Sequence, residues 1–313
     1  MATNVNDWYS DVLYNLRDAP IQESRNGRVK CELLPTLWRV DNPKQRVLFD
    51  PERRANPYLH VMETVWMFAG GKNVEFLLPF SKQMGEYAEE GGGVNGAYGH
   101  RWRFHFGRDQ ILGVIQELKL DPQSRQAVIG MYDPSIDAHP KWKDRPCNTH
   151  IYLRIVSGHL DMTVCNRSND AVWGMTGANA VHMTYLQEMI ACGIGKPVGR
   201  YYVMTNNLHI YEHHWPSLAS PQTYDYYREN IGVTPYPLMV GELEVSELME
   251  ECERFVGYGA AGDYTSGWIN DVVVPMYEHY MCRLNGDKDT YDLMETKATD
   301  WRLAEKLWRR WHK

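Results

Sequence analysis

The sequence predicts a fold of the α/β class, because segments with helical periodicity and segments with strand alternation both occur along the chain. Residues 57–69 and 109–119 carry helix patterns, whereas residues 151–155 and 160–164 alternate apolar and polar side chains. Of the 313 residues, 43% are hydrophobic and 23% are charged, which is enough to build a large core. No shift in composition marks a boundary, so residues 1–313 are expected to form a single domain.

The two helical segments have recognisable ends. Pro57 suits the first turn of the first helix, and Gly70 stops it. In the second helix, Ile111, Ile115 and Leu118 share one face, and an Asp-Pro pair follows the end. Both helices are therefore expected to pack an apolar face on the core.

The strand segments 151–155 and 160–164 flank V-S-G-H, which is typical of a hairpin turn. A later run, Y-Y-V-M-T at 201–205, is expected to form a further strand. Between these strands, residues 180–192 predict a helix that Gly193 ends. The order of elements is thus a hairpin, a helix and a strand.

The last segment, residues 299–312, predicts an amphipathic helix. Trp301, Ala304, Trp308 and Trp311 form an apolar stripe at helical spacing. Basic residues near its end complement the helix dipole. We expect this helix to dock on the core through the stripe.

Composition and charge exclude several classes of protein. A net charge of −7 and a pI near 6.0 argue against a protein that coats a nucleic-acid polymer through bulk charge. No apolar run reaches the roughly 18 residues of a membrane helix, and residues 1–9 lack the features of a secretory signal. The six cysteines form no C-x-x-C pair, so reduced thiols in the cytoplasm are expected.

One cysteine, Cys147, lies in W-K-D-R-P-C-N-T-H, directly behind a proline. Four roles are open for its thiol: core filler, metal ligand, disulfide partner or nucleophile. A lone cysteine is most often a core filler. The string H-I-Y-E-H-H invites a metal site through His209, His213 and His214, but it has no cysteine or carboxylate at ligand spacing, so no metal site is expected.

Six short motifs bear on this question because of their order. They are E-T-V-W-M-F-A-G-G at 63–71, G-A-Y-G-H-R-W-R at 96–103, D-P-Q-S-R at 121–125, R-P-C-N-T-H with N-R-S-N-D at 145–170, G-A-N-A at 177–180 and N-N-L-H-I-Y at 206–211. In this order they resemble the thymidylate synthase superfamily, which includes the pyrimidine-nucleotide hydroxymethylases. The likeness spans roughly residues 25–215, and residues 215–313 match poorly.

The resemblance implies an α+β fold with a large mixed or antiparallel sheet and packed helices. It also implies a homodimer with shared phosphate pockets and 5,10-methylenetetrahydrofolate as the cofactor. Cys147 would be the nucleophile that adds to C6 of a pyrimidine, which makes C5 reactive toward a one-carbon donor. Because the thiolate is the reactive form, Arg145 and Arg167 are expected to lower the pKa of the thiol. Tyr98 would line the thiol pocket.

Further residues match the family pattern around the nucleotide phosphate. Arg167 would hold the phosphate beside the thiolate, and Ser168 would add a hydroxyl donor. Arg125 would reach the phosphate across the dimer interface, although the second arginine usual in the family is a glutamine here. Arg25 would belong to an N-terminal phosphate loop, with Arg28 as the alternative.

Glu63 is expected to lie among apolar neighbours, because Leu59, Trp66 and Met67 follow or precede it at helical spacing. Desolvation would favour its neutral form, which suits a general acid. The family glutamate relays protons around the pyrimidine O4 and the departing folate nitrogen. The resemblance places Trp66 and Asp170 on the folate side of the site.

The resemblance also assigns the sugar and the base. His209 and Tyr211 would bind the 3′-hydroxyl of the sugar. Asn179 falls where synthases read N3–H and O4 of uracil, whereas relatives specific for cytosine have aspartate there, so dUMP is favoured. The alignment needs one extra residue between Gly174 and Asn179.

Three departures from thymidylate synthases concern the second half of the reaction. The place of a synthase tryptophan holds Met84 or Gly85, and the sequence ends R-R-W-H-K rather than in a short apolar segment. Both leave an exocyclic methylene open to water instead of hydride. Asn148 replaces a histidine after the thiol, and His150 either substitutes for it or faces a strand neighbour.

The sequence therefore predicts a one-carbon transferase that converts dUMP to 5-hydroxymethyl-dUMP, and such relatives are often phage-encoded and supply modified DNA bases. The alternatives are a thymidylate synthase, a dCMP or CMP hydroxymethylase, and a non-catalytic nucleotide-binding homologue.

Overall fold

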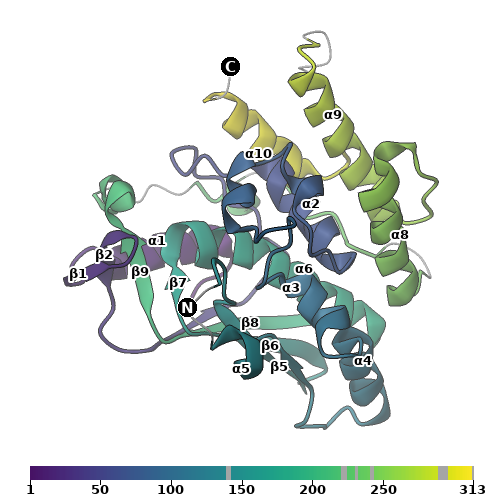
Figure 1. Cartoon of the computed structure of the whole chain (residues 1–313), viewed down its shortest axis with the longest axis horizontal. Coiled ribbons are helices and arrows are strands. Elements are labelled where there is room, and N and C mark those ends of the chain that lie inside the picture. The colour runs from purple at the N-terminus through teal and green to yellow at the C-terminus, as the bar shows by residue number, and fades with distance from the viewer. Residues whose placement is uncertain (139–141, 220–223, 230–231, 240–242, 288–294, 312–313) are drawn as a thin grey trace.

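The computed structural model describes residues 1–138, 142–219, 224–229, 232–239, 243–287 and 295–311. Two sheets and a set of helices make up the fold (Figure 1), which confirms the predicted class. One cluster of buried hydrophobic side chains extends from the N-terminal helix to the C-terminal helix. The prediction of a single domain over the whole chain stays a prediction.

The larger sheet has five strands in the order β3-β8-β6-β5-β4. All neighbours are antiparallel except β6 and β8, which are parallel, so the sheet is mixed as expected. The strands are β3 Thr36–Val40, β4 Val128–Gly130, β5 Asn148–Val156, β6 His159–Asn166 and β8 Val198–Thr205. The β5–β6 hairpin turns at Ser157 and Gly158, where both φ angles are positive, as a tight two-residue turn requires.

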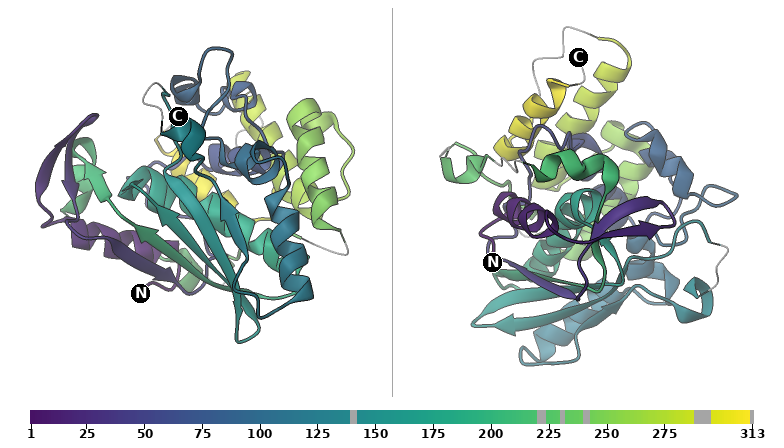
Figure 2. Two further views of the ribbon diagram at one scale, coloured as in Figure 1. Left: turned by 60° about the horizontal axis from the view of Figure 1, so that its bottom comes forward. Right: turned by 90° about the vertical axis from the view of Figure 1, so that its left-hand side faces the viewer.

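The smaller sheet, in the order β1-β2-β9-β7, brings distant segments together. Its strands are β1 Ile21–Ser24, β2 Gly27–Cys31, β7 Asn169–Asp170 and β9 Leu208–Tyr211. The parallel pairing of β7 with β9 sets Asp170 opposite His209. The β1–β2 hairpin projects from one end of the molecule (Figure 2).

Helices cover one face of the larger sheet (Figures 1 and 2). The longer ones are α1 Val5–Leu16, α2 Pro57–Phe68, α4 Gln110–Leu120, α6 Asn179–Gly193, α8 Val245–Tyr258, α9 Val274–Leu284 and α10 Thr299–Arg309. Shorter helical segments are α3 Tyr98–His100, α5 Pro134–Asp137, α7 Tyr226–Glu229, and the 3-10 or π segments Glu75–Leu77, Lys82–Tyr87, Arg101–His105, Ala171–Ala178, Glu212–Leu218, Gly259–Ala261 and Ile269–Val273.

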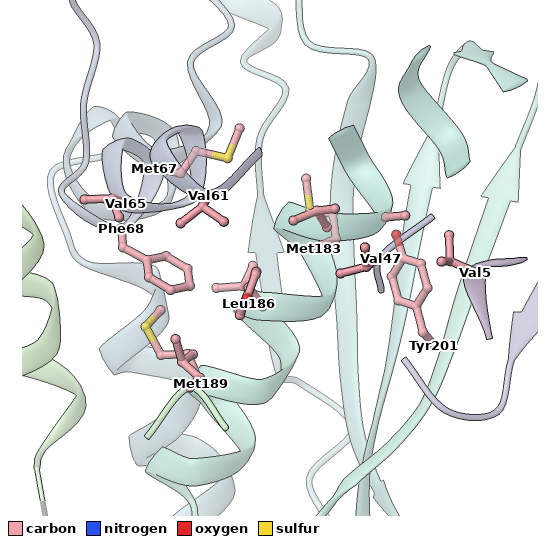
Figure 3. Packing of buried hydrophobic residues seen from close by; sticks show 14 of the residues in the cluster. Val5, Val47, Val61, Val65, Met67, Phe68, Met183, Leu186, Met189 and Tyr201 are labelled. Atoms are coloured by element: carbon pink, nitrogen blue, oxygen red, sulfur yellow. The ribbon is translucent and has the colours of Figure 1, made fainter. Parts of the chain in front are cut away.

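The centre of the core lies between α2 and α6. Val61, Val65 and Phe68 of α2 face Leu186 and Met189 of α6 (Figure 3). Both helices are buried nearly all round, because other helices and the sheet pack on their remaining sides. This packing fixes α2 rigidly beside the first turn of α6.

The opposite face of the larger sheet is open to solvent. Leu37, Val128, Tyr152 and Met204 are each more than two-fifths exposed on this face. Leu37 pairs with Met204 in β3 and β8, and Val128 pairs with Tyr152 in β4 and β5, so the four side chains form two pairs with β6 between them. A sheet face with this many exposed apolar side chains is typical of a contact surface.

The predicted helices at 57–69 and 109–119 and the predicted strands are all present. The helix predicted at 180–192 ends at Gly193, but the left-handed residue beyond it is Gly195. The expectation that Trp311 completes the C-terminal stripe is wrong: α10 ends at Arg309, and Trp311 is 44% exposed.

Within the described residues, no helix combines the length and the apolar character needed to cross a bilayer. All six cysteines have free thiols.

Candidate active site

A pocket of about 720 Å³ opens between the β1–β2 hairpin, α2 and the smaller sheet. It contains all the site residues expected from the sequence except Arg125. These are Arg25, Glu63, Trp66, Tyr98, Cys147, Arg167, Ser168, Asp170, Asn179, His209 and Tyr211. Arg125 is exposed and does not line the pocket of its own chain.

Cys147 lies immediately before β5, and two neighbours fix it. The Tyr98 hydroxyl accepts the backbone N–H groups of Cys147 and Asn148, both at 3.1 Å. The Arg167 guanidinium donates to the carbonyl oxygens of Pro146 and Arg145 and places Nη2 3.5 Å from Cys147 Sγ. The thiol therefore faces a cation whose position does not depend on the thiol itself.

Burial raises the pKa of the Cys147 thiol above its usual value. Arg167 lowers it, but the nearby carboxylates of Asp144 and Asp170 raise it further. The lowering expected from Arg167 is therefore present, but desolvation outweighs one guanidinium, so the net shift is upward. Arg145 lines the pocket but is not among the groups that shift this pKa.

Glu63 enters the pocket from the middle of α2, and its side chain is only 13% exposed. Desolvation alone raises the pKa of this carboxyl from 4.5 to about 8. The apolar surroundings expected from its helical neighbours are thus present, and the carboxyl is neutral at pH 7. A neutral carboxyl in a pocket is suited to giving a proton.

Glycines in two of the sequence motifs allow this packing. A side chain at Gly99 would meet the backbone oxygen of Met67 at 2.1 Å, so only glycine lets α3 approach α2. A side chain at Gly71 would meet the Trp66 indole at 2.3 Å. Trp66 lines the pocket while its indole N–H donates to the Asn73 carbonyl, which holds the ring in place.

Basic and polar groups gather at the hairpin end of the pocket. Arg25, in the β1–β2 turn, has no hydrogen bond or ion pair within the described part of the chain, whereas Arg28 is held by Glu212 at 2.7 Å and does not line the pocket. Arg25 is thus the better placed of the two for an anion. Ser168 Oγ lies 3.3 Å from Asn207 Oδ1, which also contacts His209 Nδ1 at 3.0 Å.

A chain of amides orients Asn179. Its Oδ1 accepts from Asn148 Nδ2 at 3.3 Å, and its Nδ2 donates to Asn169 Oδ1 at 3.2 Å. Asn148 in turn accepts from Asn166. Each amide has a donor end and an acceptor end, so this chain of hydrogen bonds fixes the orientation of the Asn179 amide oxygen and nitrogen.

The extra residue expected before Asn179 is absorbed by a π-helical segment, Ala171–Ala178. Gly177 departs from helical geometry there, with φ −105° and ψ −112°. Asn179, directly after this segment, lines the pocket. His150 does not line the pocket and packs edge-on against Tyr152 at 4.6 Å, which favours the second of its two expected positions.

Sequence reasoning missed several pocket residues. They are Asp144, Trp173, His182, Asn207, Tyr87 and Lys143. Asn207 lies inside the motif at 206–211, and Asp144 directly precedes the motif that contains Cys147, so their positions in the sequence could have indicated a place in the pocket. His182 and Trp173 carried no such signal, because their side chains reach the pocket only through helix packing. Of the two residues proposed at the missing tryptophan, Met84 lines the pocket.

Comparisons with known proteins identify the family of this chain. The family model described as thymidylate synthase matches residues 9–228. The chain belongs to the thymidylate synthase family.

Among the family's curated members, a deoxyuridylate hydroxymethyltransferase of Pseudomonas phage M6 is 36% identical over 97% of this chain and 92% of its own length. The protein of the same name from Bacillus phage SP01 is 31% identical over 90% of this chain and 74% of its own length. A putative thymidylate synthase of Methanothermobacter marburgensis is 28% identical over 66% of this chain and 88% of its own length.

Membership in the thymidylate synthase family makes this chain a one-carbon transferase. The family match starts before residue 25 and extends beyond residue 215, and the M6 relative also aligns with most of the remaining chain. Within the described residues, no group of three or more His, Cys, Asp or Glu side chains is arranged to hold a metal ion.

Proposed function

We propose that this protein catalyses the folate-dependent hydroxymethylation of dUMP at C5, with 5-hydroxymethyl-dUMP as the product. The observation that carries the proposal is the shared pocket of Cys147, Arg167 and Glu63: a thiol 3.5 Å from a guanidinium, with a desolvated carboxyl in the same wall. Relatives named deoxyuridylate hydroxymethyltransferase support it.

In the proposed mechanism, Cys147 as thiolate adds to C6 of uracil, and the electron pair of the C5=C6 bond moves toward C4–O4. C5 would then bond to the one-carbon unit as that carbon's bond to one folate nitrogen breaks, and C5 would lose its hydrogen as a proton. Release of tetrahydrofolate from the second nitrogen would leave an exocyclic double bond at C5. Tyr98 and Arg167 hold the sulfur in place for this step. Covalent catalysis divides one difficult substitution into two easier additions.

The same pocket has groups for the rest of the nucleotide. We propose that Arg25, Arg167 and Ser168 bind the phosphate, because they offer charged and neutral donors at one end of the pocket. His209 and Tyr211 are proposed to bind the 3′-hydroxyl; their rings pack edge-on with centroids 5.1 Å apart.

Asn179 supports uracil as the base. Its amide is anchored to Asn148 and Asn169, and each polar end retains capacity for a further hydrogen bond. An amide can therefore accept from N3–H and donate to O4 together. A cytosine ring presents the opposite pattern at N3 and N4.

We propose 5,10-methylenetetrahydrofolate as the cofactor, which supplies the one-carbon unit when bound. The pocket fits it in volume and chemistry. Trp173, which is 39% exposed, provides a flat ring for a planar partner. Trp66 lies in the same wall, and Asp170 accepts from Val172 N through Oδ1 while Oδ2 has no hydrogen bond within the described residues. Asp170 would hold ring N–H groups of a pterin.

Water rather than hydride is proposed as the final nucleophile. Of Met84 and Gly85, the two candidates for the place of a synthase tryptophan, Met84 lines the pocket, and a thioether chain would shield an exocyclic methylene less than an indole does. No residue after Tyr211 within the described ranges lines the pocket, and Trp311 stacks on Arg54 at 4.3 Å instead.

The direct test is incubation of the protein with methylenetetrahydrofolate and each of dUMP, dCMP, UMP and CMP. Mass spectrometry should show a hydroxymethyl product from dUMP, with no rise in absorbance from dihydrofolate. A methyl product with that rise would show an ordinary thymidylate synthase. Binding of dUMP without exchange of its C5 hydrogen would show a non-catalytic homologue.

We further propose a homodimer formed through the open face of the larger sheet, acting in the cytoplasm of a phage-infected host. The exposed Leu37, Tyr152 and Met204 supply the apolar surface. Arg125, exposed and outside its own pocket, would reach the phosphate site of the second copy.

Mixing two inactive variants tests the shared site. A Cys147→Ser copy and an Arg125→Glu copy each lack one required group, but a mixed dimer contains one site with both groups intact. Activity should return on mixing after gentle dissociation. If sedimentation shows only monomers, or mixing restores nothing while dimers form, Arg125 has no role across an interface.

A further inference from the structure

His182 is a buried histidine in the wall of the pocket that the proposed mechanism does not use. It lies in the first turn of α6 and is 1% exposed. Its Nε2 has no hydrogen-bond partner and lies 3.6 Å from Oε2 of Glu63. Buried polar atoms are nearly always paired, so an unpaired nitrogen aimed at an active-site carboxyl calls for an explanation.

Both partners are neutral in this environment. Burial lowers the pKa of His182 to about 3 and raises the pKa of Glu63 to about 8. The nearest ring on the far side is His60, 6.2 Å away between centroids, and burial also lowers its pKa. The pair is therefore a carboxylic acid facing a neutral imidazole, not an ion pair.

The tautomer of His182 follows from its other contact. The ring is hydrogen-bonded to the backbone of His60, and this bond raises its pKa, as a carbonyl acceptor does. The ring N–H is used there, which leaves Nε2 as a lone pair directed at Glu63. At 3.6 Å this lone pair is beyond hydrogen-bond distance, but a small rotation of the Glu63 carboxyl would let its O–H donate to Nε2.

We propose that His182 is a positioning residue that aims the Glu63 carboxyl and drives it to recover a proton from the attacking water. The inference rests on the proposed function. After Glu63 gives up its proton, the carboxylate faces the lone pair of Nε2 and is a stronger base. The water oxygen bonds to the exocyclic carbon, and its proton goes to Glu63.

The electron pairs that this addition displaces stay within the substrate and the Cys147 sulfur. The pair of the exocyclic double bond moves through C5 toward C4–O4, then returns to form C5=C6 as the bond from C6 to the Cys147 sulfur breaks. The step consumes one water and needs no oxidant or reductant. His182 keeps its own protons throughout and acts only through Glu63.

The experiment compares wild type with His182→Leu and His182→Gln. The leucine lacks an acceptor, whereas the glutamine amide can present its oxygen to Glu63. His182→Asn, whose amide is shorter, is a second loss variant should the leucine variant not fold. Two rates are measured in a single turnover, with enzyme and methylenetetrahydrofolate in excess over nucleotide, so that an adduct waiting for water does not block a later turnover: tritium release from [5-³H]dUMP and formation of 5-hydroxymethyl-dUMP.

His182→Leu and His182→Asn should slow hydroxymethyl formation about 10- to 100-fold, with tritium release reduced much less and KM for dUMP unchanged. His182→Gln should restore most of the product rate. The control is His60→Leu, which removes a buried ring that does not line the pocket and should keep the wild-type ratio of product to tritium.

Equal losses in tritium release and product, or no rescue by glutamine, would overturn the inference. A wild-type protein that makes no hydroxymethyl product would overturn the proposed function instead. The role of His182 alone would be overturned if the wild type makes the hydroxymethyl product and the loss variants keep the wild-type ratio of product to tritium.

Discussion

Arg167 places its guanidinium 3.5 Å from the sulfur of Cys147 while two backbone carbonyl oxygens hold it from behind. The backbone N–H of Arg167 also donates to the carbonyl of Cys147 at 2.9 Å. The two residues are therefore tied together through main chain and side chain. A cation held in this way stabilises a thiolate without the entropy cost of ordering a free side chain.

Replacement of Arg167 by methionine should raise the pKa of Cys147 further, because the guanidinium is the group that lowers it. Iodoacetamide should then alkylate the thiol several-fold more slowly at pH 8. The measurement is the rate of alkylation against pH, with Cys147→Ser as the blank for the other cysteines. An unchanged pH profile would show that Arg167 does not act on the sulfur.

Replacement of Asp144 should change the pKa of Cys147 in the opposite direction to replacement of Arg167. Its carboxylate raises the pKa of Cys147, and Asp144 Oδ2 accepts from Gly96 N at 3.0 Å. Asp144→Asn keeps an acceptor for Gly96 but removes the charge, so alkylation of Cys147 at pH 8 should become faster. A slower rate would mean that the substitution disturbs the loop rather than the electrostatics.

Glu63→Gln should flatten the pH dependence of stability. The carboxyl has a pKa of about 8 in the fold and 4.5 as its usual value, so the folded state holds an extra proton between these limits. Stability from this group is complete below pH 4.5 and is lost as the pH rises through about 8. The loss is on the order of a few kcal/mol.

Urea unfolding of wild type and Glu63→Gln at pH 5, 7 and 9 measures this effect. As the pH rises, the free energy of unfolding of the wild type should fall relative to that of the variant, because glutamine has no proton to lose. Parallel stability curves would show that Glu63 is not desolvated in the folded protein.

Asn179→Asp should shift preference from dUMP toward dCMP. An ionised aspartate can only accept, which suits the N4 amino group of cytosine and opposes O4 of uracil. The ratio of kcat/KM for the two nucleotides is the measurement, and a change of about 100-fold is expected from one mismatched polar contact at a buried site. The base assignment is wrong if the ratio does not move.

Gly99→Ala should destabilise the protein strongly, because the new methyl group would lie 2.1 Å from the backbone oxygen of Met67. A loss of about 3 kcal/mol or more is expected from such overpacking. Gly257→Ala is the matched control: it lies in α8 with nothing within 4 Å of the added carbon, so helix propensity predicts a gain of up to about 1 kcal/mol. Thermal unfolding distinguishes the expected loss of stability in Gly99→Ala from the expected gain in Gly257→Ala.

The sequence predicted the parts of the fold with strong local signals. Pro57 and the apolar run after it defined α2, and the V-S-G-H turn defined the β5–β6 hairpin. It did not predict the β1–β2 hairpin, because residues 21–31 are mostly polar and exposed there, which gives no alternation to detect. Helix α8 was missed because its region carries no motif of the family.

Among the pocket residues too, those with a local sequence signal were predicted and the others were not. Cys147, Arg167 and Glu63 were found because each lies in a motif whose order is specific. His182 was not found, because a histidine three residues after Asn179 acquires meaning only when α6 packs against α2. The lowering of the Cys147 pKa by Arg167 was predicted, but the larger rise from burial was not, because a sequence shows nearby charges but not how deeply the sulfur is buried.

The wide turn at Ala171–Ala178 has a consequence for how these proteins diverge. The backbone departs from helical geometry at Gly177, and Asn179, for which we propose the reading of the base, lines the pocket directly after this segment. With that proposed role, descendants of one ancestor can differ in length here and still present the amide to the same pyrimidine edge, and the base preferences of relatives of both lengths would test this.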